Sequence, residues 1–578
     1  MTQRVYDRWL KWEGHLLEDP DLGDELRWVR DQTENQDQEI TDRFYKDLEF
    51  GTGGLRGIIG VGSNRLNIYT VAKATQGYME YLKEFGGRKV AIAYDSRIKS
   101  ELFAKTAAEV FAAGGAEVLM FSELMPTPVL SYAIRYLNCD GGIVITASHN
   151  PAEYNGYKVY GSDGGQITDS VAKAILNKIK SIDIFEGVQR VAFDQAVREG
   201  KISYINSEVV QNYLSVVSEE AFDRTVHKDL SIVYTPLNGT GLKCVLSSLE
   251  RNGFSDVTVV EEQRFPDGNF PTCRVPNPEK KEALQMGIEY AEEKGVDLVL
   301  ATDPDCDRVG IAVKTQQGYE LISGNEMGVL LLNYICMRRI RSGKMPERPI
   351  CMKTIVTTDL ACKVGESYGV EVQDVLTGFK YIGEKIGVLE KNGEKERFIL
   401  GIEESYGYLT GTYVRDKDGV NASLLICEMA AYYKKQGKNL VDVLKNIYEK
   451  FGYCVNTQYT YRFEGAAGTD KMKQIMDKLR DDIQESDTFL GNRLVSAYDY
   501  LKSRVFGIGG KNEVIDLPKA NVCKMVWEDG TSLVIRPSGT EPKLKIYIAV
   551  EGNNREEATK KEYKFAELVK KYINSLGA

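Results

Sequence analysis

The chain has 578 residues, of which 43% are hydrophobic and 27% charged, and its formal net charge is −10 at pH 7. A chain of this length is expected to form several domains, and its composition is ordinary for a soluble globular protein. The acidic balance argues against a nucleic-acid-binding protein, because such proteins usually carry a basic surplus.

Patterns typical of targeting or membrane insertion are not found. No apolar run reaches the roughly 18 residues that a membrane span needs. The first 25 residues are charged throughout and lack the apolar segment of a secretory signal. The 10 cysteines form no CxxC pair, which indicates reduced thiols. We therefore expect a cytoplasmic protein that binds neither membranes nor nucleic acid.

Short apolar runs alternate with helical patterns along most of the chain. The first 40 or so residues are predicted to form a helical N-terminal extension. The predicted strands are residues 90–93, 117–121, 142–145, 230–234, 257–261 and 296–301. The predicted helices are residues 101–113, 241–252 and 282–295. Strands separated by helices indicate βαβ units, whose sheets are largely parallel and buried on both faces.

The last part of the chain has a different pattern. An amphipathic helix is predicted at 469–486, followed by strands at 524–527, 532–535 and 543–550 and a helix at 556–576. Such a grouping is typical of an α+β domain. The predicted domains are therefore three α/β domains at 1–205, 206–325 and 326–456, the first including the extension, and an α+β domain at 457–578.

The stretch TASHNP, residues 146–151, follows the predicted strand 142–145 and contains Ser148 and His149. A serine hydroxyl is a poor nucleophile without a neighbouring base or metal. The GxSxG elbow of hydrolases does not fit, because Ala147 and His149 flank the serine. The motif therefore predicts either a serine activated in some other way or an ordinary turn.

The stretch DPDCDR, residues 303–308, follows the predicted strand 296–301. Asp303, Asp305 and Asp307 would point the same way in an extended segment, and ligands of open α/β sheets bind at such strand ends. Carboxylates that crowd together repel one another, and Mg²⁺ would relieve that repulsion. A calcium loop is excluded, because its sixth and twelfth positions hold Arg308 and Lys314. The alternative is a solvated acidic turn.

Three further motifs are rich in polar residues or glycine. The segment RPSGTEPK, 536–543, has the residue types of an anion-binding nest, although a plain β-turn uses similar residues. The segment EESYG, 403–407, offers carboxylates and a serine to sugar hydroxyls. The segment GTGGLRG, 51–57, is predicted to be a flexible loop with one arginine. It is a poor dinucleotide motif, because no strand is predicted before it. An acidic site, a phosphate-binding loop and a reactive serine together indicate phosphoryl transfer.

These motifs, in this order from Gly51 to Lys543, resemble those of the α-D-phosphohexomutase superfamily, especially its phosphoglucomutase branch. The resemblance implies four domains around a central cleft, with three related α/β domains and a C-terminal α+β domain. It implies a phosphorylated Ser148, one Mg²⁺ held by Asp303, Asp305, Asp307 and the phosphoserine, and glucose 1,6-bisphosphate as intermediate and activator. The partners implied are small sugar phosphates, and the chain would be a monomer or a dimer.

The resemblance also implies roles for the other motif residues. It places Arg308 beside the transferring phosphoryl group and gives acid–base work to Lys380. It matches Arg56 to the active-site arginine of the first loop and Lys158 to the lysine after TASHNP. The residues implied to bind the substrate are Thr377, Gly378, Glu403, Ser405, Arg536, Ser538, Gly539, Thr540 and Lys543. His149 is expected to order the serine loop.

The sugar specificity is left open by departures from the family pattern. Many members have serine where this chain has Gly53, and the extension and Tyr406 resemble longer phosphoglucomutase and phosphopentomutase-like members. The expected activity is that of a phosphoglucomutase, with phosphomannomutase and phosphopentomutase as alternatives. A phosphoglucosamine mutase usually has glutamine and histidine in the sugar loop, which EESYG lacks. A Mg²⁺-dependent sugar phosphatase and a silent sugar-phosphate-binding protein are alternatives of other classes.

Overall fold

The computed structural model describes residues 1–32, 34–51, 53–223, 228–463, 465–485, 488–507, 512–538 and 543–577. The chain forms two compact units. The first contains Met1–Gly324, Phe379–Gly401 and Ser405–Asn439, and the second contains Asn325–Gly378, Ile402–Glu404 and the chain from Leu440 onward. No helix in the described ranges is long and apolar enough to cross a membrane.

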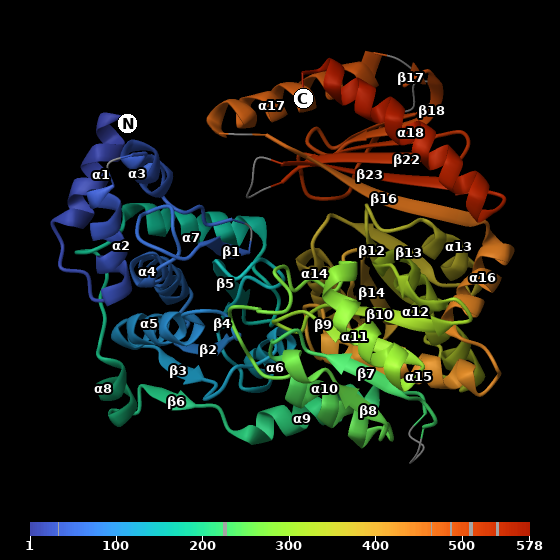
Figure 1. The fold of residues 1–578 in the computed structure, drawn as a ribbon, viewed down its shortest axis with the longest axis horizontal. Helices are drawn as coiled ribbons and strands as arrows, with labels where there is room; N and C mark the ends of the chain where they lie inside the picture. Colours follow the sequence, from blue (N-terminus) through green and yellow to red (C-terminus); the bar gives the residue numbers. More distant parts are fainter. Residues whose placement is uncertain are drawn as a thin grey trace. The chain divides into compact units, whose positions relative to one another are not determined.

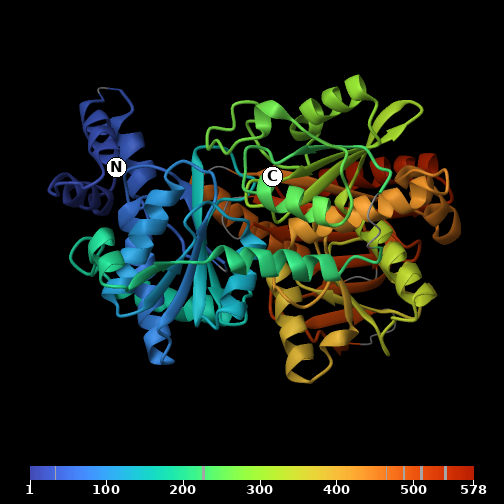
Figure 2. The same cartoon turned by 90° about the horizontal axis from the view of Figure 1, so that it is seen from below.

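The N-terminal extension is helical, as predicted. Its helices are α1 (Gln3–Glu13), α2 (Pro20–Asp31) and α3 (Gln36–Phe44). The Thr2 side chain caps α1, and Asp19 caps α2. The buried ring of Trp12 packs edge-on against Phe44, Tyr69 and Phe185. The extension therefore shares the core of the domain that follows it, and Figures 1 and 2 show these dark-blue helices beside that domain.

The first sheet combines parallel and antiparallel strands in the order β1-β5-β4-β2-β3-β6. Its strands are β1 (Gly54–Ile58), β2 (Lys89–Tyr94), β3 (Glu117–Met120), β4 (Gly141–Ile145), β5 (Tyr154–Gly161) and β6 (Ile202–Tyr204). Its helices are α4 (Ile68–Glu84), α5 (Ser100–Ala113), α6 (Thr127–Tyr136), α7 (Asp169–Ser181) and α8 (Phe193–Arg198). The strands β4, β2, β3 and β6 are parallel, whereas β5 and β1 are antiparallel additions.

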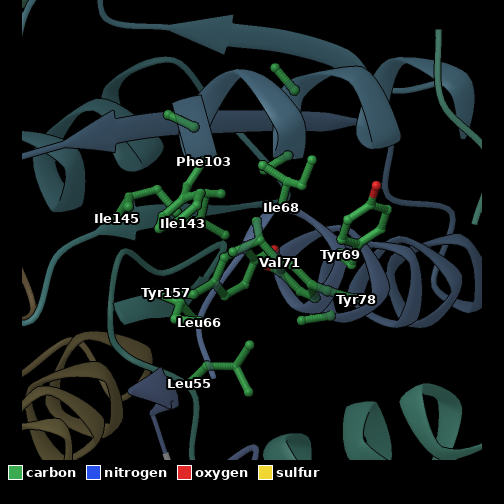
Figure 3. Close-up of a cluster of buried hydrophobic side chains, with 14 of the residues drawn as sticks. Leu55, Leu66, Ile68, Tyr69, Val71, Tyr78, Phe103, Ile143, Ile145 and Tyr157 are labelled. Atoms are coloured by element: carbon green, nitrogen blue, oxygen red, sulfur yellow. The ribbon is translucent and has the colours of Figure 1, made fainter. Parts of the chain in front are cut away.

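The core of this domain lies between α4 and the sheet (Figure 3). Ile68 and Val71 of α4 belong to one buried cluster with Ile143 and Tyr157 of the sheet. The Tyr78 hydroxyl donates to the Tyr160 carbonyl at 2.8 Å, so this buried phenol keeps a hydrogen bond. A side chain at Gly141 would collide with that hydroxyl, because its Cβ would lie 2.0 Å away. The glycine therefore lets α4 approach the sheet closely.

The second sheet is also mixed, in the order β11-β10-β9-β7-β8. Its strands are β7 (Ile232–Thr235), β8 (Val257–Val259), β9 (Leu298–Thr302), β10 (Val309–Thr315) and β11 (Gly318–Ile322). Its helices are α9 (Ser207–Glu219), α10 (Gly241–Arg251), η1 (Glu261–Gln263) and α11 (Lys281–Lys294). Here β9, β7 and β8 are parallel, and β10 returns antiparallel beside β9. The prediction of largely parallel sheets is thus right for the centre of both sheets and wrong for β1, β5, β10 and β11.

The third α/β segment has a four-stranded sheet in the order β13-β12-β14-β15. Its strands are β12 (Ile350–Thr354), β13 (Glu371–Val375), β14 (Phe398–Glu403) and β15 (Gly407–Leu409). Its helices are α12 (Gly324–Arg341), α13 (Leu360–Ser367), α14 (Phe379–Lys391), η2 (Lys395–Arg397), α15 (Gly419–Lys434) and α16 (Leu440–Phe451). Strand β12 and the edge strand β13 are parallel, as a βαβ unit requires.

The C-terminal domain is the predicted α+β domain. Its strands are β16 (Tyr453–Arg462), β17 (Thr488–Phe489), β18 (Asn492–Asp499), β19 (Arg504–Gly507), β20 (Asn512–Val514), β21 (Cys523–Trp527), β22 (Ser532–Pro537) and β23 (Lys543–Gly552). The sheet order is β16-β23-β22-β21-β18-β19-β20, with antiparallel neighbours. Its helices, α17 (Gly465–Glu485) and α18 (Arg555–Ser575), pack on the sheet in one core that includes Leu479, Trp527 and Phe565.

Candidate active site

The serine loop begins where β4 ends and turns directly into the antiparallel strand β5. Ser148 is buried and has a positive φ of 54°, a left-handed conformation that costs a non-glycine residue roughly 1–2 kcal/mol. Its backbone N–H donates to Thr146 Oγ1 at 2.8 Å. Its hydroxyl donates to Asp303 Oδ2 at 2.7 Å and lies 3.1 Å from His149 Nδ1. The turn therefore presents the serine oxygen to the acidic loop of the second sheet.

His149 is a neutral imidazole in this setting. Burial lowers its pKa well below the usual value, and the charges of Arg308 and Arg56 lower it further. The Ser148 hydroxyl has one hydrogen, which it gives to Asp303, so the contact with His149 requires an N–H at Nδ1. His149 consequently acts as a neutral hydrogen-bond donor to the serine oxygen.

The acidic loop forms a tight turn between β9 and β10 and does not adopt the extended conformation considered from the sequence. Asp303 Oδ1 accepts from the backbone N–H groups of Asp307 and Arg308, both at 3.0 Å. Cys306 has a left-handed φ of 53°, which reverses the chain. The turn gathers the carboxylates of Asp303, Asp305 and Asp307, and their nearest oxygens all lie within 4.8 Å of one another.

The acidic loop fits a metal ion. All three aspartates are buried, and Asp305 Oδ1 and Asp307 Oδ1 accept no hydrogen bond from the described part of the chain. Burial, with the charges of Asp305 and Asp307, raises the pKa of Asp303 well above its usual value. A divalent cation with oxygen ligands would satisfy the two free oxygens and relieve the repulsion. These carboxylates have the chemistry that Mg²⁺ prefers.

Two buried lysines and a threonine surround the aspartates. Lys158 Nζ lies 2.6 Å from Asp305 Oδ2 and 3.2 Å from Asp307 Oδ2. Burial alone would lower the pKa of Lys158, but the two aspartate charges raise it above its usual value. Lys417 Nζ lies 3.2 Å from Asp307 Oδ2. Thr127, at the start of α6, donates from Oγ1 to Asp305 Oδ2 at 2.9 Å.

Lys417 and Thr127 were not predicted to belong to the site. Lys417 stands in the charged run 415–418, which normally indicates a solvated surface, yet all four side chains are buried. Thr127 follows Pro126 as a helix start signal and carries no sign of a contact 178 residues away. The charged run 415–418 lies close in sequence to the predicted sugar-binding motif 403–407, and this was the one sequence signal that could have placed Lys417 in the site.

The two predicted arginines lie close enough to act on His149. Arg56 stands on strand β1, so the expectation of a flexible loop at this position was wrong. The strand forms because residues 54–58 pair in register with β5. Arg56 Nη1 donates to Asn150 Oδ1 at 3.3 Å, within the serine loop. Arg308 Nη1 donates to Glu279 Oε1 at 2.5 Å.

Lys380 has an acidic partner that the sequence did not predict. Its Nζ, near the start of α14, donates to Asp169 Oδ1 at 2.5 Å, and the Tyr381 hydroxyl donates to Asp169 Oδ2 at 3.1 Å. Asp169 is the first residue of α7. The first unit thus gives Lys380 a carboxylate partner that fixes the position of its ammonium group.

The second unit contains most of the predicted substrate-binding residues. Arg536 lies on β22, with Nε and Nη2 each 3.4 Å from the Tyr547 hydroxyl. Burial opposes its charge, but Tyr547, Glu404 and Glu403 raise its pKa above the usual value. Glu403, at the end of β14, therefore lies near Arg536.

The other predicted substrate-binding residues are described only in part. The Ser538 N–H donates to the Lys543 carbonyl at 2.7 Å, next to the paired strands β22 and β23. Gly539 and Thr540 lie outside the described residues. Thr377 Oγ1 is buried and has no hydrogen-bond partner in the described ranges, and Gly378 has a φ of 118°. Ser405 is partly buried in the first unit.

Comparison with known proteins assigns the chain to a family. Family models described as phosphoglucomutase/phosphomannomutase match alpha/beta/alpha domain I at residues 47–185, domain II at 211–318, domain III at 323–451 and the C-terminal domain at 497–568. A phosphoglucomutase of Staphylococcus saprophyticus subsp. saprophyticus is 35% identical over 535 residues, which cover 92% of this chain and 96% of that protein. One of Staphylococcus haemolyticus is 34% identical, covering 90% and 94%.

A solved structure is similar in fold. The open form of pp63/parafusin, a phosphoglucomutase from Paramecium, superposes with a TM-score of 0.67 at 19% identity and covers 92% of this chain and 96% of its own. The four matched domains run in the order of the four motif groups described above. The chain therefore belongs to the phosphoglucomutase/phosphomannomutase family.

Proposed function

We propose that this chain is a phosphoglucomutase that interconverts α-D-glucose 1-phosphate and glucose 6-phosphate. The observation that carries the proposal is the Ser148 hydroxyl, 2.7 Å from Asp303 in a buried cluster of three carboxylates that fits a metal ion. That arrangement suits phosphoryl transfer through a serine. The S. saprophyticus relative, 35% identical over nearly the whole chain, is named a phosphoglucomutase, which supports glucose as the sugar.

In the proposed reaction, phosphorylated Ser148 gives its phosphoryl group to the free hydroxyl of a bound sugar monophosphate. The bond from phosphorus to Ser148 Oγ breaks, and a bond to the sugar oxygen forms. The sugar 1,6-bisphosphate then turns by half a rotation without leaving, and its other phosphate returns to Ser148. Glucose 1,6-bisphosphate from solution would phosphorylate an empty Ser148 in the same way, which makes it the activator.

The residues around Ser148 supply charge and hydrogen bonds to this step. The neutral His149 donates from Nδ1 to the serine oxygen, which becomes negative as the phosphorus–oxygen bond breaks. Arg56 and Arg308 place positive charge near the same imidazole and favour an anionic phosphoryl group there. Asp303, Asp305 and Asp307 would hold one Mg²⁺, which neutralises phosphoryl charge when bound.

We assign proton transfer to Lys380. Its ammonium donates to Asp169 Oδ1 at 2.5 Å. Lys380 as a neutral amine would take the proton of the attacking sugar hydroxyl, and on the return step the ammonium so formed would give that proton back to the sugar oxygen that leaves. Asp169 would orient Lys380 in both steps.

Substrate binding must serve both orientations of the sugar. We propose that the loop with Arg536, Ser538, Gly539, Thr540 and Lys543 binds the phosphate that is not reacting, because a phosphate looks the same from either end. Thr377, Gly378, Glu403 and Ser405 would contact sugar hydroxyls that both orientations present similarly. The arginine fork suits phosphate oxygens, and carboxylates suit hydroxyl donors.

We also propose domain boundaries at 1–205, 206–325, 326–456 and 457–578, and a monomer or dimer in the cytoplasm. The ten free cysteines, nine of them buried, support a reducing compartment.

The reaction can be tested by ³¹P NMR of the purified protein with Mg²⁺ and a trace of glucose 1,6-bisphosphate. Separate tubes receive α-glucose 1-phosphate, mannose 1-phosphate and ribose 1-phosphate, and Ser148→Ala is the control. Fast conversion of the glucose ester to the 6-phosphate supports the proposal. Faster conversion of mannose or ribose would assign another sugar, and release of inorganic phosphate alone would indicate a phosphatase. No reaction in any tube would contradict the mutase mechanism.

A further inference from the structure

Arg97 lies beyond the end of β2, and its side chain is fully buried against the serine loop. Nη1 donates to the carbonyls of Pro151 and Tyr154 at 2.8 and 2.9 Å. Nη2 donates to the carbonyl of Ser148 at 2.6 Å and also to that of Asn150. One guanidinium group thus binds four carbonyls of the segment that carries the serine. Neither the sequence motifs nor the proposed mechanism assigns it a role.

A second set of bonds ties the same arginine to the start of the loop. Arg97 Nε lies 3.4 Å from Asp95 Oδ2, and Asp95 Oδ1 accepts from the Arg97 N–H at 2.9 Å and the Ser100 hydroxyl at 2.7 Å. Thr146 lies close to Asp95, and its hydroxyl oxygen accepts the Ser148 N–H at 2.8 Å. The serine is therefore held at its N–H through Thr146 and at its carbonyl by Arg97.

The arginine is sealed from solvent on the side of the second domain. The Arg97 guanidinium carbon lies 5.0 Å from the centre of the Phe270 ring, and Phe270 is itself buried. A side chain on Gly268 would meet backbone N of Ile98 at 2.5 Å, so this segment packs directly on the chain that follows Arg97. Water is excluded there, and buried carbonyls need a protein partner. Without the arginine, the loop carbonyls would have to find other donors.

We propose that Arg97 is a positioning residue that holds Ser148 in its left-handed conformation, with Oγ directed at Asp303. The inference rests on the proposed function for its effect on catalysis, but its structural part stands on the contacts alone. A serine at a φ of 54° persists only where its surroundings over-determine it. The fork of a guanidinium reaches four carbonyls at once, whereas a lysine ammonium has three donors on one nitrogen and cannot reproduce that pattern. Arg97 touches no substrate in this role.

The test compares Arg97→Lys with the matched control Arg65→Lys. Arg65 is also buried, donates to the backbone carbonyls of Asp42 and Asn64, and pairs with the Asp42 carboxylate, but it lies away from the serine loop. Mutase kinetics give kcat and KM for each protein. Hydrogen–deuterium exchange of the peptide covering 146–155, without any ligand, reports how firmly the loop is held. Labelled phosphate from glucose 1,6-bisphosphate measures the rate at which Ser148 is phosphorylated.

For R97K we expect kcat and the phosphorylation rate to fall about 100-fold, the effect of displacing a reacting group by roughly 1 Å, with KM within about threefold of wild type. Exchange in 146–155 should be at least about tenfold faster. R65K should change neither kcat nor exchange in this peptide by more than about threefold. An R97K protein with kcat within threefold of wild type, or with unchanged exchange, overturns the proposal.

Thr146→Val is the second variant and decides the question if R97K does not fold. It keeps the guanidinium fork and removes the hydroxyl that accepts the Ser148 N–H. We expect a smaller fall in kcat, about tenfold, with faster exchange in 146–155; unchanged values for both overturn the positioning scheme. A wild-type protein without mutase activity would refute the proposed function, and the exchange comparison would still decide whether Arg97 holds the loop.

Discussion

Replacing Lys158 by methionine separates the charge of the lysine from its packing. The ammonium lies 2.6 Å from Asp305 Oδ2 and 3.2 Å from Asp307 Oδ2. At an effective dielectric constant near 20 these two attractions amount to roughly 6 and 5 kcal/mol before desolvation. Removing one partner of a buried ion pair lowers the free energy of unfolding by about 3–5 kcal/mol, because the other charge stays buried and uncompensated. In K158M the cluster retains its three carboxylates.

The same change should make the protein respond more strongly to Mg²⁺. A dication bound at the three carboxylates would replace the lost positive charge, so K158M should bind Mg²⁺ more tightly than wild type does. Binding at 100 times the dissociation constant adds about 2.7 kcal/mol to the stability. After EDTA treatment, we expect the Tm of K158M to lie about 10 °C below wild type. Adding Mg²⁺ should raise it by more than it raises the wild type.

Lys353→Met is the matched control. Lys353 is equally buried between two carboxylates, with Nζ 2.8 Å from both Asp359 Oδ1 and Asp374 Oδ1. Neither aspartate belongs to the Asp303, Asp305 and Asp307 cluster, the group in the described residues that could hold a metal ion. K353M should therefore lose similar stability that Mg²⁺ does not restore. Differential scanning fluorimetry with and without Mg²⁺ checks both variants. Equal Mg²⁺ shifts in K158M and K353M would refute the reasoning.

Three further outcomes follow from the site. Ser148→Ala should lower kcat at least about 10⁴-fold with an unchanged far-UV circular dichroism spectrum; retained turnover would exclude the serine mechanism. Burial and the charges of Arg308 and Arg56 hold the pKa of His149 well below 6.5. As the pH is lowered below 6.5, only the unfolded chain takes up this proton, so the free energy of unfolding decreases. His149→Asn should reduce that fall between pH 6.5 and 5.5 by about 1 kcal/mol in urea unfolding, and an identical fall would count against a buried neutral imidazole. Arg536→Ala should raise KM for the sugar phosphate about 10–100-fold with a smaller effect on kcat; steady-state kinetics with an unchanged KM would remove Arg536 from the phosphate-binding loop.

The strands that lead into the site were predictable from local sequence. The run 142–145 is apolar throughout and 296–301 is apolar apart from Asp297, and they correspond to β4 (Gly141–Ile145) and β9 (Leu298–Thr302). The helices 101–113 and 282–295 correspond within a residue to α5 and α11. Periodicity over about ten residues suffices for such elements, because each buries its own apolar face. The polar clusters TASHNP and DPDCDR, which follow these two strands, could also be recognised from the local sequence.

The return strands and their contacts were not predictable in this way. Strand β5 runs antiparallel to β4, and this register places Lys158 opposite Val144 and Gly54. Nothing within ten residues of Lys158 indicates that its partners are 147 and 149 residues away in the chain. Glycine-rich 54–58 looks like a loop by itself and becomes a strand only because β5 offers it a partner.

The sequence by itself determined which chemical groups this protein has near its strand ends: a serine, three carboxylates and the residue types of an anion-binding segment, with the strands before them. These depend on residue types and on spacing over a few positions. The tertiary structure alone decided which charges meet. Lys417 beside Asp307, Lys380 beside Asp169 and Arg97 beneath the serine loop join residues dozens to hundreds of positions apart. Their burial is stable only when those partners are present, since a buried charge without one is too costly to keep.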